Sequence, residues 1–356
     1  MTADLTFERF RDYMVGPARF MNLLSVFELG LIDELREHGA LTAAQLGAAA
    51  GTRPDAVEQL LLLPVKEGFV AHDEASGQYS LDSLARVDQT DVQRLLTLMN
   101  MIKVVMLRQV FYLTESVQTG TVVGLEKLYG YQGNLYGAVA EHKDLRESWA
   151  TLMDNVTEYI DTWFFANVDI PAGSQVLDVA GNTGLGAILT YRRKQSPGLH
   201  VTTFDLPEKE SECLENFRAH GVAEHCSFIG GDVFESVPTG FDVALVKHFL
   251  DMFDKDQVFE ILRGVHGALP AGGQIHILVP VYPEDVKGDD NVDIDFFPAF
   301  FLGCTMGQGG PQKMSTYRAW LEECGFEVTR TLTQDRATMP PGTFVVHGIL
   351  SATKTA

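Results

Sequence analysis

The apolar residues follow a helical period through the first part of the chain. Residues 20–35 carry apolar side chains three and four positions apart, which predicts an amphipathic helix. Thr42 and Gln45 have the spacing of a capping box, so we expect a second helix to begin there and to end at Gly51. Pro54 suits the first turn of a third helix, where no backbone donor is needed. The chain therefore opens with a mainly helical module.

A β-hairpin is predicted next, over residues 69–81, with its turn at Ser76 and Gly77. Two helices followed by a hairpin are typical of a winged-helix module, which serves either to bind DNA or to pack and dimerise. DNA binding needs a basic surface, yet residues 41–70 contain only Arg53 and Lys66 as basic residues. The pattern therefore favours packing or dimerisation.

Residues 84–115 continue as a predicted helix that is rich in Met, Leu and Val. Its apolar residues occupy more than the single stripe that faces the core in a surface helix. Such a helix must be covered on several sides, by another part of the chain or by a second subunit. We favour a homodimer and keep burial within one chain as the alternative.

From residue 172 onward, short β-branched runs alternate with helical stretches, which predicts a parallel sheet with helices on both faces. The expected strands are 175–179, 200–205, 226–229, 242–247 and 274–281, and the expected helices lie near 185–194, 208–220 and 254–268. Two later runs, 327–333 and 343–352, are strand-like and suit antiparallel pairing at one edge. The expected fold is a helical, winged-helix-like domain (1–115) followed by a doubly wound α/β domain (116–356) that begins with a helical linker to residue 170.

Composition and charge narrow the class of protein. The chain has 356 residues, 46% of them hydrophobic, which suits two packed domains. Its net charge of −21 argues against nucleic acids and anionic membranes as partners. No apolar run approaches the roughly 18–20 residues of a membrane span, and no signal peptide is evident, so we expect a cytoplasmic protein. The four cysteines lack CxxC spacing and are expected to be reduced and buried.

The first predicted strand runs into a glycine-bearing turn, VLDVAGNTGLG (176–186), of the kind that lets backbone approach a ligand. The turn has neither GxGxxG nor a GKS or GKT ending, which disfavours dinucleotides and nucleoside triphosphates. Asp205 ends the second strand, about 20 residues later, where a carboxylate can bind both ribose hydroxyls. Asp232 and Phe234 follow the third strand and suit the amino group and the ring face of adenine.

These segments are followed by DVALVKHFLDMF (242–253), ALPAGGQIHILVP (268–280) and YRAWLEECGF (317–326). The ordered set resembles the S-adenosylmethionine-dependent small-molecule O-methyltransferases of bacterial secondary metabolism and plant phenolic pathways. The resemblance covers nearly the whole chain, because that family also has a helical, winged-helix-like dimerisation domain. It implies a doubly wound sheet with a reversed last strand, a homodimer, S-adenosylmethionine as methyl donor and S-adenosylhomocysteine as product.

The resemblance also implies positions for the cofactor. The methionine part falls at Asp178, Gly181 and Gly184, the ribose at Asp205 and Leu206, and the adenine at Asp232 and Phe234, with Lys247 close by. The turn reads AGNTG where the family commonly has GGGTG, so Ala180 and Asn182 replace two glycines. Asn tolerates left-handed backbone angles better than most residues, and we therefore expect a working turn.

The family's usual catalytic base is absent. Its common LHDW segment carries a histidine that deprotonates the acceptor, and alignment on the preceding LVK puts Asp251 at that position, with Met252 and Phe253 after it. The glutamate of the family's GGxERT segment is also missing from QGGPQKMS (308–315). Full proton transfer from a phenol, pKa about 10, to an ordinary Asp, pKa about 3.9, would cost on the order of 8 kcal/mol.

Four interpretations follow for this position. His248 acts as the base, since imidazole suits neutral pH, or Asp251 acts with a pKa raised by burial. Otherwise the acceptor needs no strong base, being a carboxylate, an acidic phenol, or an electron-rich or enolisable carbon, the last of which would mean C-methylation. In the fourth interpretation the protein uses its cofactor without transferring methyl groups. The structural alternatives are a packed His248 and an Asp251 that caps a helix, although Asp254 is the better cap.

A metal at this position would need a third ligand besides His248 and Asp251. The nearest candidates are Asp293 and Asp295, but two acidic residues at this spacing more often face solvent. The sequence therefore predicts no metal.

The acceptor pocket is expected to be aromatic. Phe296, Phe297, Phe300 and Phe301, together with Trp149 and Met153 on an earlier helix, lie where the family places acceptor-lining residues, and a flat aromatic molecule would stack well there. The same phenylalanines could instead be core. The predicted function is methylation, most commonly at oxygen, of a small aromatic or apolar metabolite.

Overall fold

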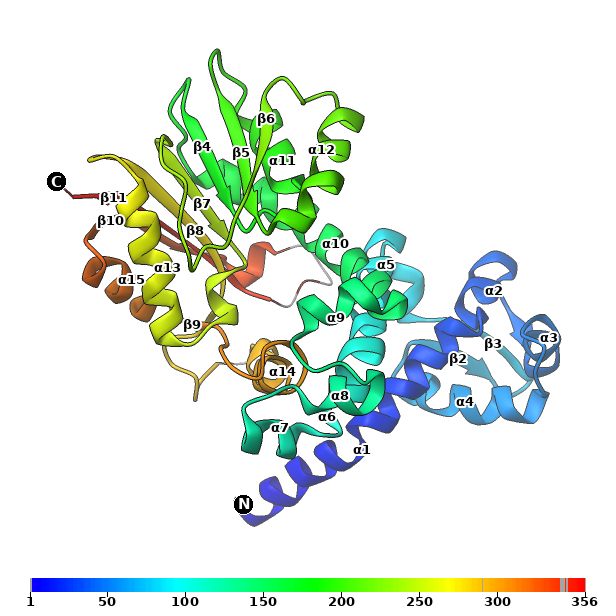
Figure 1. Cartoon of the computed structure of the whole chain (residues 1–356). Coiled ribbons are helices and arrows are strands. Elements are labelled where there is room, and N and C mark those ends of the chain that lie inside the picture. The colour runs from blue at the N-terminus through cyan, green and yellow to red at the C-terminus, as the bar shows by residue number, and fades with distance from the viewer. Residues whose placement is uncertain (1, 290, 340–342, 344, 356) are drawn as a thin grey trace. The chain divides into compact units, whose positions relative to one another are not determined.

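The computed structural model describes residues 2–289, 291–339, 343 and 345–355, and it divides into two compact units at Met99/Asn100 (Figure 1). From the sequence we expected this boundary at residue 115, at the end of one continuous helix over 84–115. The structure instead has α5 (Gln89–Met101), a π-helical segment (Ile102–Leu107) and the short α6 (Arg108–Val110). The π-helical segment packs against helices of the second unit, and this packing moves the boundary toward the N-terminus.

The first unit contains the predicted helices and hairpin. Its elements are α1 (Thr2–Glu28), α2 (Leu31–His38), β1 (Leu41–Thr42), α3 (Ala43–Ala49), α4 (Pro54–Lys66), β2 (Val70–Asp73) and β3 (Gln78–Leu81). The strands form an antiparallel sheet in the order β1-β3-β2. Thr42 and Gln45 form the predicted capping box, and Gly77 takes the left-handed conformation in the hairpin turn. Buried Leu31, Leu46 and Leu61 join α2, α3 and α4 in one core.

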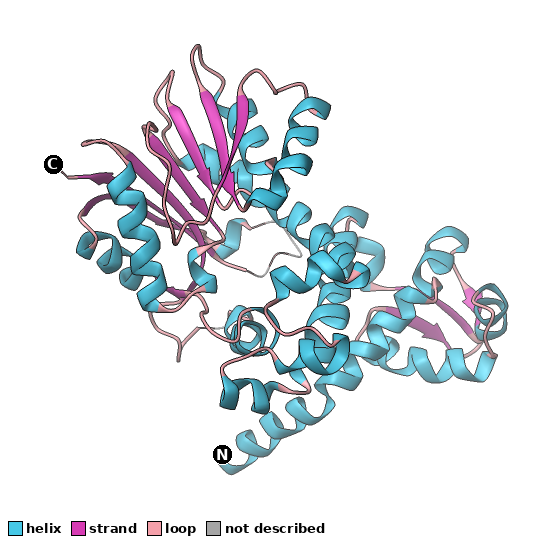
Figure 2. Ribbon diagram, in the orientation of Figure 1, coloured by secondary structure: helices cyan, strands magenta, loops and turns pink. Residues whose placement is uncertain are grey.

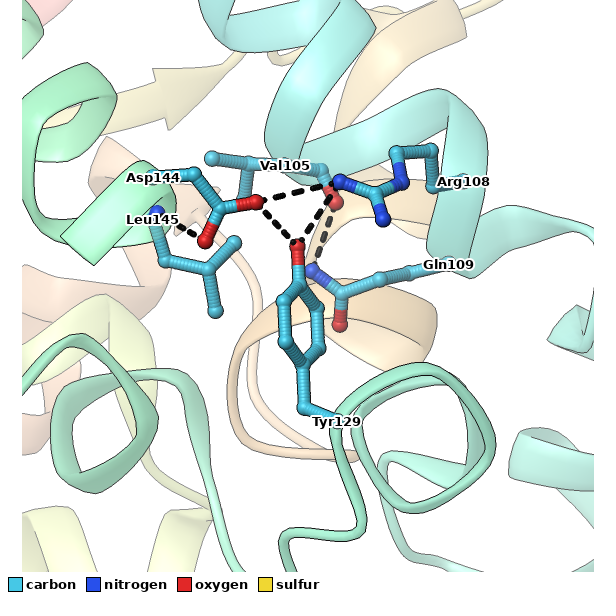
Figure 3. A network of polar contacts seen from close by, with 6 residues as sticks. All are labelled: Val105, Arg108, Gln109, Tyr129, Asp144 and Leu145. Carbon is cyan, nitrogen blue, oxygen red and sulfur yellow. Dashed lines mark hydrogen bonds and ion pairs between the residues drawn. The ribbon is translucent and has the colours of Figure 1, made fainter. Parts of the chain in front are cut away.

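After α6, the second unit has three short helices, α7 (Leu113–Thr119), α8 (Val123–Tyr129) and α9 (Leu135–Glu141). The long α10 (Lys143–Asn167) follows them. A polar network ties α6, α8 and α10 together (Figure 3). Arg108 Nη1 donates to the Tyr129 hydroxyl at 3.0 Å and to Asp144 Oδ2 at 3.2 Å, and the hydroxyl donates to Asp144 Oδ2 at 3.1 Å. Burial raises the pKa of Tyr129 to about 12, so it remains a donor. The network holds the first turn of α10, whose later turns reach the candidate site.

The sheet of the second unit confirms the doubly wound prediction. Its strands are β4 (Gln175–Val179), β5 (His200–Asp205), β6 (Cys226–Gly230), β7 (Val243–Lys247), β8 (Gln274–Tyr282), β10 (Phe326–Thr333) and β11 (His347–Lys354). They lie in the order β10-β11-β8-β7-β4-β5-β6. The strands from β6 to β8 are parallel, whereas β11 is antiparallel to both of its neighbours, as expected of a reversed last strand. The short β9 (Gln312–Lys313) pairs with the end of β8.

Helices cover both faces of this sheet (Figure 2). They are α11 (Leu185–Lys194), α12 (Glu210–Ala219), α13 (Lys255–Ala268) and α15 (Met314–Glu323), with α14 (Asp293–Phe300) in the connection after β8. One core joins α10, α11 and α12 to the sheet through Phe164, Ile188 and Phe217, and the other joins α13 and α15 through Leu262 and Leu321.

Two further sequence expectations concern the cysteines and membrane spans. Cys213, Cys226, Cys304 and Cys324 are free and buried, as expected. None of the helices in the described ranges is long and apolar enough to span a membrane alone, although two bent pairs, Phe7–Glu28 with Leu31–His38 and Gln89–Val110 with Leu113–Thr119, reach that length and hydropathy together.

Candidate active site

The turn between β4 and α11 takes the left-handed conformation at three positions. The φ angles are 54° at Ala180, 51° at Asn182 and 82° at Gly184. Backbone hydrogen bonds hold it, since Ala180 N donates to the Phe204 carbonyl at 2.8 Å and Asn182 N donates to Asp205 Oδ2 at 2.8 Å. The turn expected from AGNTG therefore forms, with the strain of two non-glycine residues at positive φ, each costing on the order of 1–3 kcal/mol.

The glycines of this turn leave no room for side chains. A Cβ on Gly181 would lie 2.7 Å from Asp178 Oδ2, and one on Gly184 would lie 2.6 Å from Cys213 Sγ. A Cβ on Gly186, in the first turn of α11, would overlap Lys247 Nζ. The glycines therefore let the backbone of the turn pack directly on the side chains of Asp178, Cys213 and Lys247.

Beneath the turn lies a set of buried polar groups with unsatisfied hydrogen-bonding capacity. Asp178 is fully buried at the end of β4, and its Oδ1 lies 3.1 Å from Nζ of Lys247 on β7. Beyond this ion pair, Asp178 Oδ2, Lys247 Nζ and Asp161 Oδ2 have no hydrogen-bond partner among the residues the structure describes. Buried polar atoms are nearly always paired, so these atoms suit a polar ligand such as the amino-acid tail of the S-adenosylmethionine implied by the sequence.

Asp205 is the last residue of β5 and Leu206 follows it, beside the glycine turn. Asp205 accepts hydrogen bonds from Asn182 N and from Leu206 N, each at 2.8 Å, so each carboxylate oxygen keeps a free lone pair. Burial raises the pKa of Asp205, and the two backbone hydrogen bonds oppose that rise. The Leu206 side chain is exposed and free to contact a ligand. This geometry fits a carboxylate that accepts from two ribose hydroxyls.

Asp232 and Phe234 follow β6 in the same way. Asp232 Oδ1 accepts from Phe234 N at 2.9 Å, and the Phe234 ring meets Phe253 edge-on at 5.3 Å. Because β4, β5 and β6 are neighbours in the parallel sheet, Asp178 near the end of β4, Asp205 at the end of β5 and Asp232 after β6 all lie at the same edge. The three carboxylates that the sequence singled out therefore lie along one edge.

Asp251 occupies a 3₁₀ turn (Leu250–Met252) after β7. Its side chain is buried, and Oδ1 has no hydrogen-bond partner within the described part of the chain. Burial raises the pKa of Asp251 to about 7. Gly310 N donates to the Asp251 carbonyl at 2.7 Å, and Gly309 contacts the same turn so closely that a Cβ would clash. Asp251 is not a helix cap, because Asp254 caps α13 by accepting from Gln257 N at 3.0 Å.

His248 directly follows β7 and has a strained backbone conformation, with φ of 50°. Its backbone N donates to the Leu278 carbonyl, and its ring meets the His347 ring edge-on at 4.9 Å. Burial, with a contribution from Lys247, lowers the pKa of His248 to about 4, so the ring is neutral at pH 7. Its Nε2 has no partner among the described residues. His248 is thus a packed neutral histidine with one free ring nitrogen.

The two aspartates considered as further metal ligands have separate surroundings. Asp293 is buried and accepts a hydrogen bond from Val346 N at 2.8 Å through Oδ2, while Asp295 is exposed. In the ranges that the structure describes, no three His, Cys, Asp or Glu side chains are grouped so as to hold a metal ion.

An aromatic stack joins α9, α10 and α14. Trp149 stacks on Phe300 with ring centroids 6.1 Å apart, and Phe300 stacks on Phe296 at 4.9 Å. Phe297 and Phe301 are buried in the same cluster, and Met153 lies half-buried one turn after Trp149. Every acceptor residue that the sequence suggested therefore lies on these helices or directly after α14.

Sequence reasoning missed two residues of this region. Tyr136 on α9 meets Trp149 edge-on at 5.9 Å, and burial, together with the negative charge of Asp251, raises the pKa of its hydroxyl. Asp161 on α10 is 2% exposed, and burial raises its pKa to about 6, against the opposing charge of Lys247. Neither residue belongs to a motif, and only the packing of α9 and α10 brings them to the site.

Comparison with known proteins identifies the family to which the chain is similar. The family model described as an O-methyltransferase domain matches residues 111–327, and that of an O-methyltransferase dimerisation domain matches residues 12–90. The chain is 24% identical over 355 residues to the L-tyrosine C(3)-methyltransferase of Streptomyces lavendulae, covering 99% of this chain and 94% of that protein. It is 26% identical over 339 residues to the 3-amino-4-hydroxybenzoate 4-O-methyltransferase of Streptomyces cremeus, covering 93% and 88%. The solved structure of the S-adenosylmethionine-dependent methyltransferase SibL, in its apo form, has the same fold, with a TM-score of 0.78 at 23% identity over 98% of this chain and 99% of that one.

Proposed function

Because the chain belongs to the O-methyltransferase family, we propose that it transfers the methyl group of S-adenosylmethionine to a small aromatic or similarly apolar metabolite. The observation that carries this proposal is the row formed by Asp178, Asp205 and Asp232 at one edge of the sheet, beside a glycine turn without room for a Cβ. When bound, the cofactor supplies a methyl group activated by a sulfonium. The chain's own residues hold the donor, position the acceptor and manage the proton.

We propose the following cofactor contacts, as carried over from the family resemblance. Asp178, Gly181 and Gly184 border the methionine part, Asp205 and Leu206 the ribose, and Asp232 and Phe234 the adenine, with Lys247 close by. The free lone pairs of Asp205 support its part, since a carboxylate with one backbone donor on each oxygen still accepts from two hydroxyls.

We propose that Asp251 is the base when the acceptor is a hydroxyl. A pKa of about 7 suits general-base catalysis near neutral pH. Proton transfer from a phenol, pKa about 10, then costs about 4 kcal/mol, half the cost for an ordinary aspartate. His248, with a pKa of about 4, would face a cost of about 8 kcal/mol. Asp251 Oδ1 and His248 Nε2 both lack a partner among the described residues, so the higher pKa of Asp251 is what supports this assignment over His248.

The acceptor is proposed to bind beside the stack of Trp149, Phe300 and Phe296. Two parallel ring contacts in this stack support a flat aromatic acceptor, which would gain the same offset stacking. Tyr136 meets Trp149 edge-on, and the Asp251 carboxylate acts electrostatically on its hydroxyl, which supports an acceptor site near the proposed base. Positioning of this kind can supply much of the rate of a displacement reaction.

C-methylation is the second candidate function. Asp251 stands where the family's base histidine is usual, and the S. lavendulae relative, which is named a C(3)-methyltransferase of L-tyrosine, aligns over nearly the whole chain. An aromatic carbon ortho to a hydroxyl would need the same deprotonation, followed by loss of the ring proton. Mass spectrometry of the product separates the two outcomes, because fragmentation locates the methyl group on a ring carbon or on an oxygen.

We also propose a homodimer. The dimerisation-domain match supports it, as does the apolar side of α1, where Phe7, Phe10, Tyr13 and Met14 are each more than 60% exposed in the single chain. Side chains of this size are rarely left open to water in such a row, and a second copy would cover them.

The test is calorimetric titration with S-adenosylmethionine and S-adenosylhomocysteine. Wild type is compared with Asp205→Ala and with the matched control Asp256→Ala, which removes an exposed carboxylate from α13. We expect binding by wild type and by the control, and at least tenfold weaker binding by Asp205→Ala, about 1.4 kcal/mol. If neither ligand binds wild type, the proposed function is wrong. A screen of phenols, aromatic acids and enolisable keto acids by mass shift then identifies the acceptor class.

A further inference from the structure

Three ionisable side chains converge beneath the glycine turn, from α10, β4 and β7. Asp178 and Lys247 form an ion pair at 3.1 Å, and the Lys247 ammonium also lies 5.9 Å from the ring centroid of Phe165 on α10. Asp161 precedes Phe165 by one helical turn and so lies on the same face of α10. Lys247 and Asp178 both act electrostatically on Asp161, which is the third member of the cluster.

The charges of this cluster do not balance. Two buried carboxylates face one buried ammonium group, and the ion pair commits that ammonium to Asp178. Arg193 also acts on Asp161, but its guanidinium is exposed and donates to Thr162 Oγ1 at 3.1 Å. Asp161 Oδ2 has no hydrogen-bond partner in the described part of the chain. A buried carboxylate without a full counter-charge is costly, so the cluster has a place for one more cationic donor.

We propose that Asp161 accepts the α-ammonium group of the cofactor's amino-acid tail, while Lys247 Nζ donates to the α-carboxylate. This proposal rests on the proposed function and adds a residue that no motif of the chain identifies. The zwitterionic tail brings one cation and one anion, and Lys247, with three donors, can serve both Asp178 and a ligand carboxylate. Because Gly186 has no Cβ, the Lys247 ammonium and the Asp178 carboxylate can lie directly against the first turn of α11.

A purely structural role for Asp161 makes a different prediction. If the carboxylate only ties α10 to the sheet, its loss would weaken every ligand of the site to the same degree. If it binds the ammonium group, its loss would weaken only ligands that carry that group. The difference between two ligands therefore decides the matter, independently of overall stability or activity.

The experiment is calorimetric titration with S-adenosylhomocysteine and with its desamino analogue, in which hydrogen replaces the ammonium group. Wild type is expected to bind S-adenosylhomocysteine at least tenfold more tightly than the analogue. Asp161→Asn keeps the shape but removes the charge, and we expect it to bind the two ligands within about threefold of each other, with the analogue bound as by wild type. Asp161→Ala serves as a second variant, and thermal melting confirms that both are folded.

Asp293→Asn is the matched control, because Asp293 is equally buried but accepts from Val346 N outside the cluster. It should keep the preference of wild type. An equal loss for both ligands in Asp161→Asn, or an unchanged preference, overturns the proposal while the proposed function stands. Failure of wild type to bind S-adenosylhomocysteine at all refutes the proposed function itself and this inference with it.

Discussion

Replacing Asp251 by asparagine should stabilise the protein at alkaline pH and inactivate it. The carboxyl is buried, and its pKa rises from an ordinary 3.8 to about 7. Folding thus disfavours the ionised form, so the native state binds more protons than the unfolded state between these two values. The free energy of unfolding therefore falls as pH rises from 4 to 7, by about 4 kcal/mol in total for this group. Asparagine has no charge to bury and escapes that loss.

The assay is urea unfolding of wild type and Asp251→Asn at pH 4.5, 6, 7 and 8. The stability difference between the two should grow in favour of the variant by about 3 kcal/mol between the lowest and highest pH, because other titrating groups cancel in the comparison. Asp295→Asn, which removes an exposed carboxylate, should show no such trend. Over the same range, kcat/KM of wild type on a phenolic acceptor should rise and level off above pH 7. At pH 8, kcat/KM of Asp251→Asn should be about 10²–10⁴-fold lower than that of wild type.

A stability difference that stays constant across this pH range would refute the reasoning. It would mean that Asp251 ionises at its ordinary pKa and gains nothing from burial. The cost of deprotonating a phenol would then return to about 8 kcal/mol, and Asp251 would lose its claim to be the base. A flat stability trend combined with full activity of the variant would point instead to an acceptor that needs no base.

Four further outcomes are expected. His248→Ala should keep kcat within about fivefold, as measured by product formation, because a histidine of pKa about 4 adds little as a base at pH 7. Trp149→Ala should raise KM for an aromatic acceptor about tenfold while calorimetry shows unchanged S-adenosylhomocysteine binding, since the indole stacks in the aromatic cluster. Gly186→Ala should abolish that binding, because its Cβ would meet Lys247 and Asp178. Phe10→Asp combined with Tyr13→Asp should convert a dimer to a monomer in light scattering after size exclusion, given how exposed both rings are in one chain.

The regular elements of the second unit were predictable from the sequence. The strands 175–179 and 200–205 appear at the predicted residues, because each is a short β-branched run that ends at a turn. The run 343–352 was predicted less well, since β11 begins only at His347. Its earlier residues are as apolar as the strand, and composition alone does not reveal where pairing with β8 starts.

The helix predicted over 84–115 shows a second limit of sequence reasoning. Its apolar residues lie on most sides, so they carry no periodic signal that could mark the π-helical segment Ile102–Leu107. Part of the candidate site was predictable and part was not. Asp178, Asp205 and Asp232 lie at or just after the ends of strands, so their shared edge was foreseeable from the alternating pattern of strands and helices. Asp161 and Tyr136 lie on helices whose packing against the site depends on long-range contacts, which no local motif records.

The replacement of the family's histidine by Asp251 and the loss of its glutamate belong together. An aspartate base needs a high pKa, which burial supplies, but a second carboxylate nearby would charge the site twice and make ionisation of either group costly. In the order of the GGxERT pattern, the glutamate's place is taken by Gln312, a neutral side chain that donates to the Gly310 carbonyl at 3.0 Å. Gly310 N in turn donates to the Asp251 carbonyl, so this loop contacts the proposed base through its backbone rather than through a charged side chain. Burial thus raises the pKa of Asp251, as a carboxylate partner raises the pKa of a histidine. The same burial that lowers the cost of proton transfer to Asp251 also lowers the free energy of unfolding at neutral and higher pH.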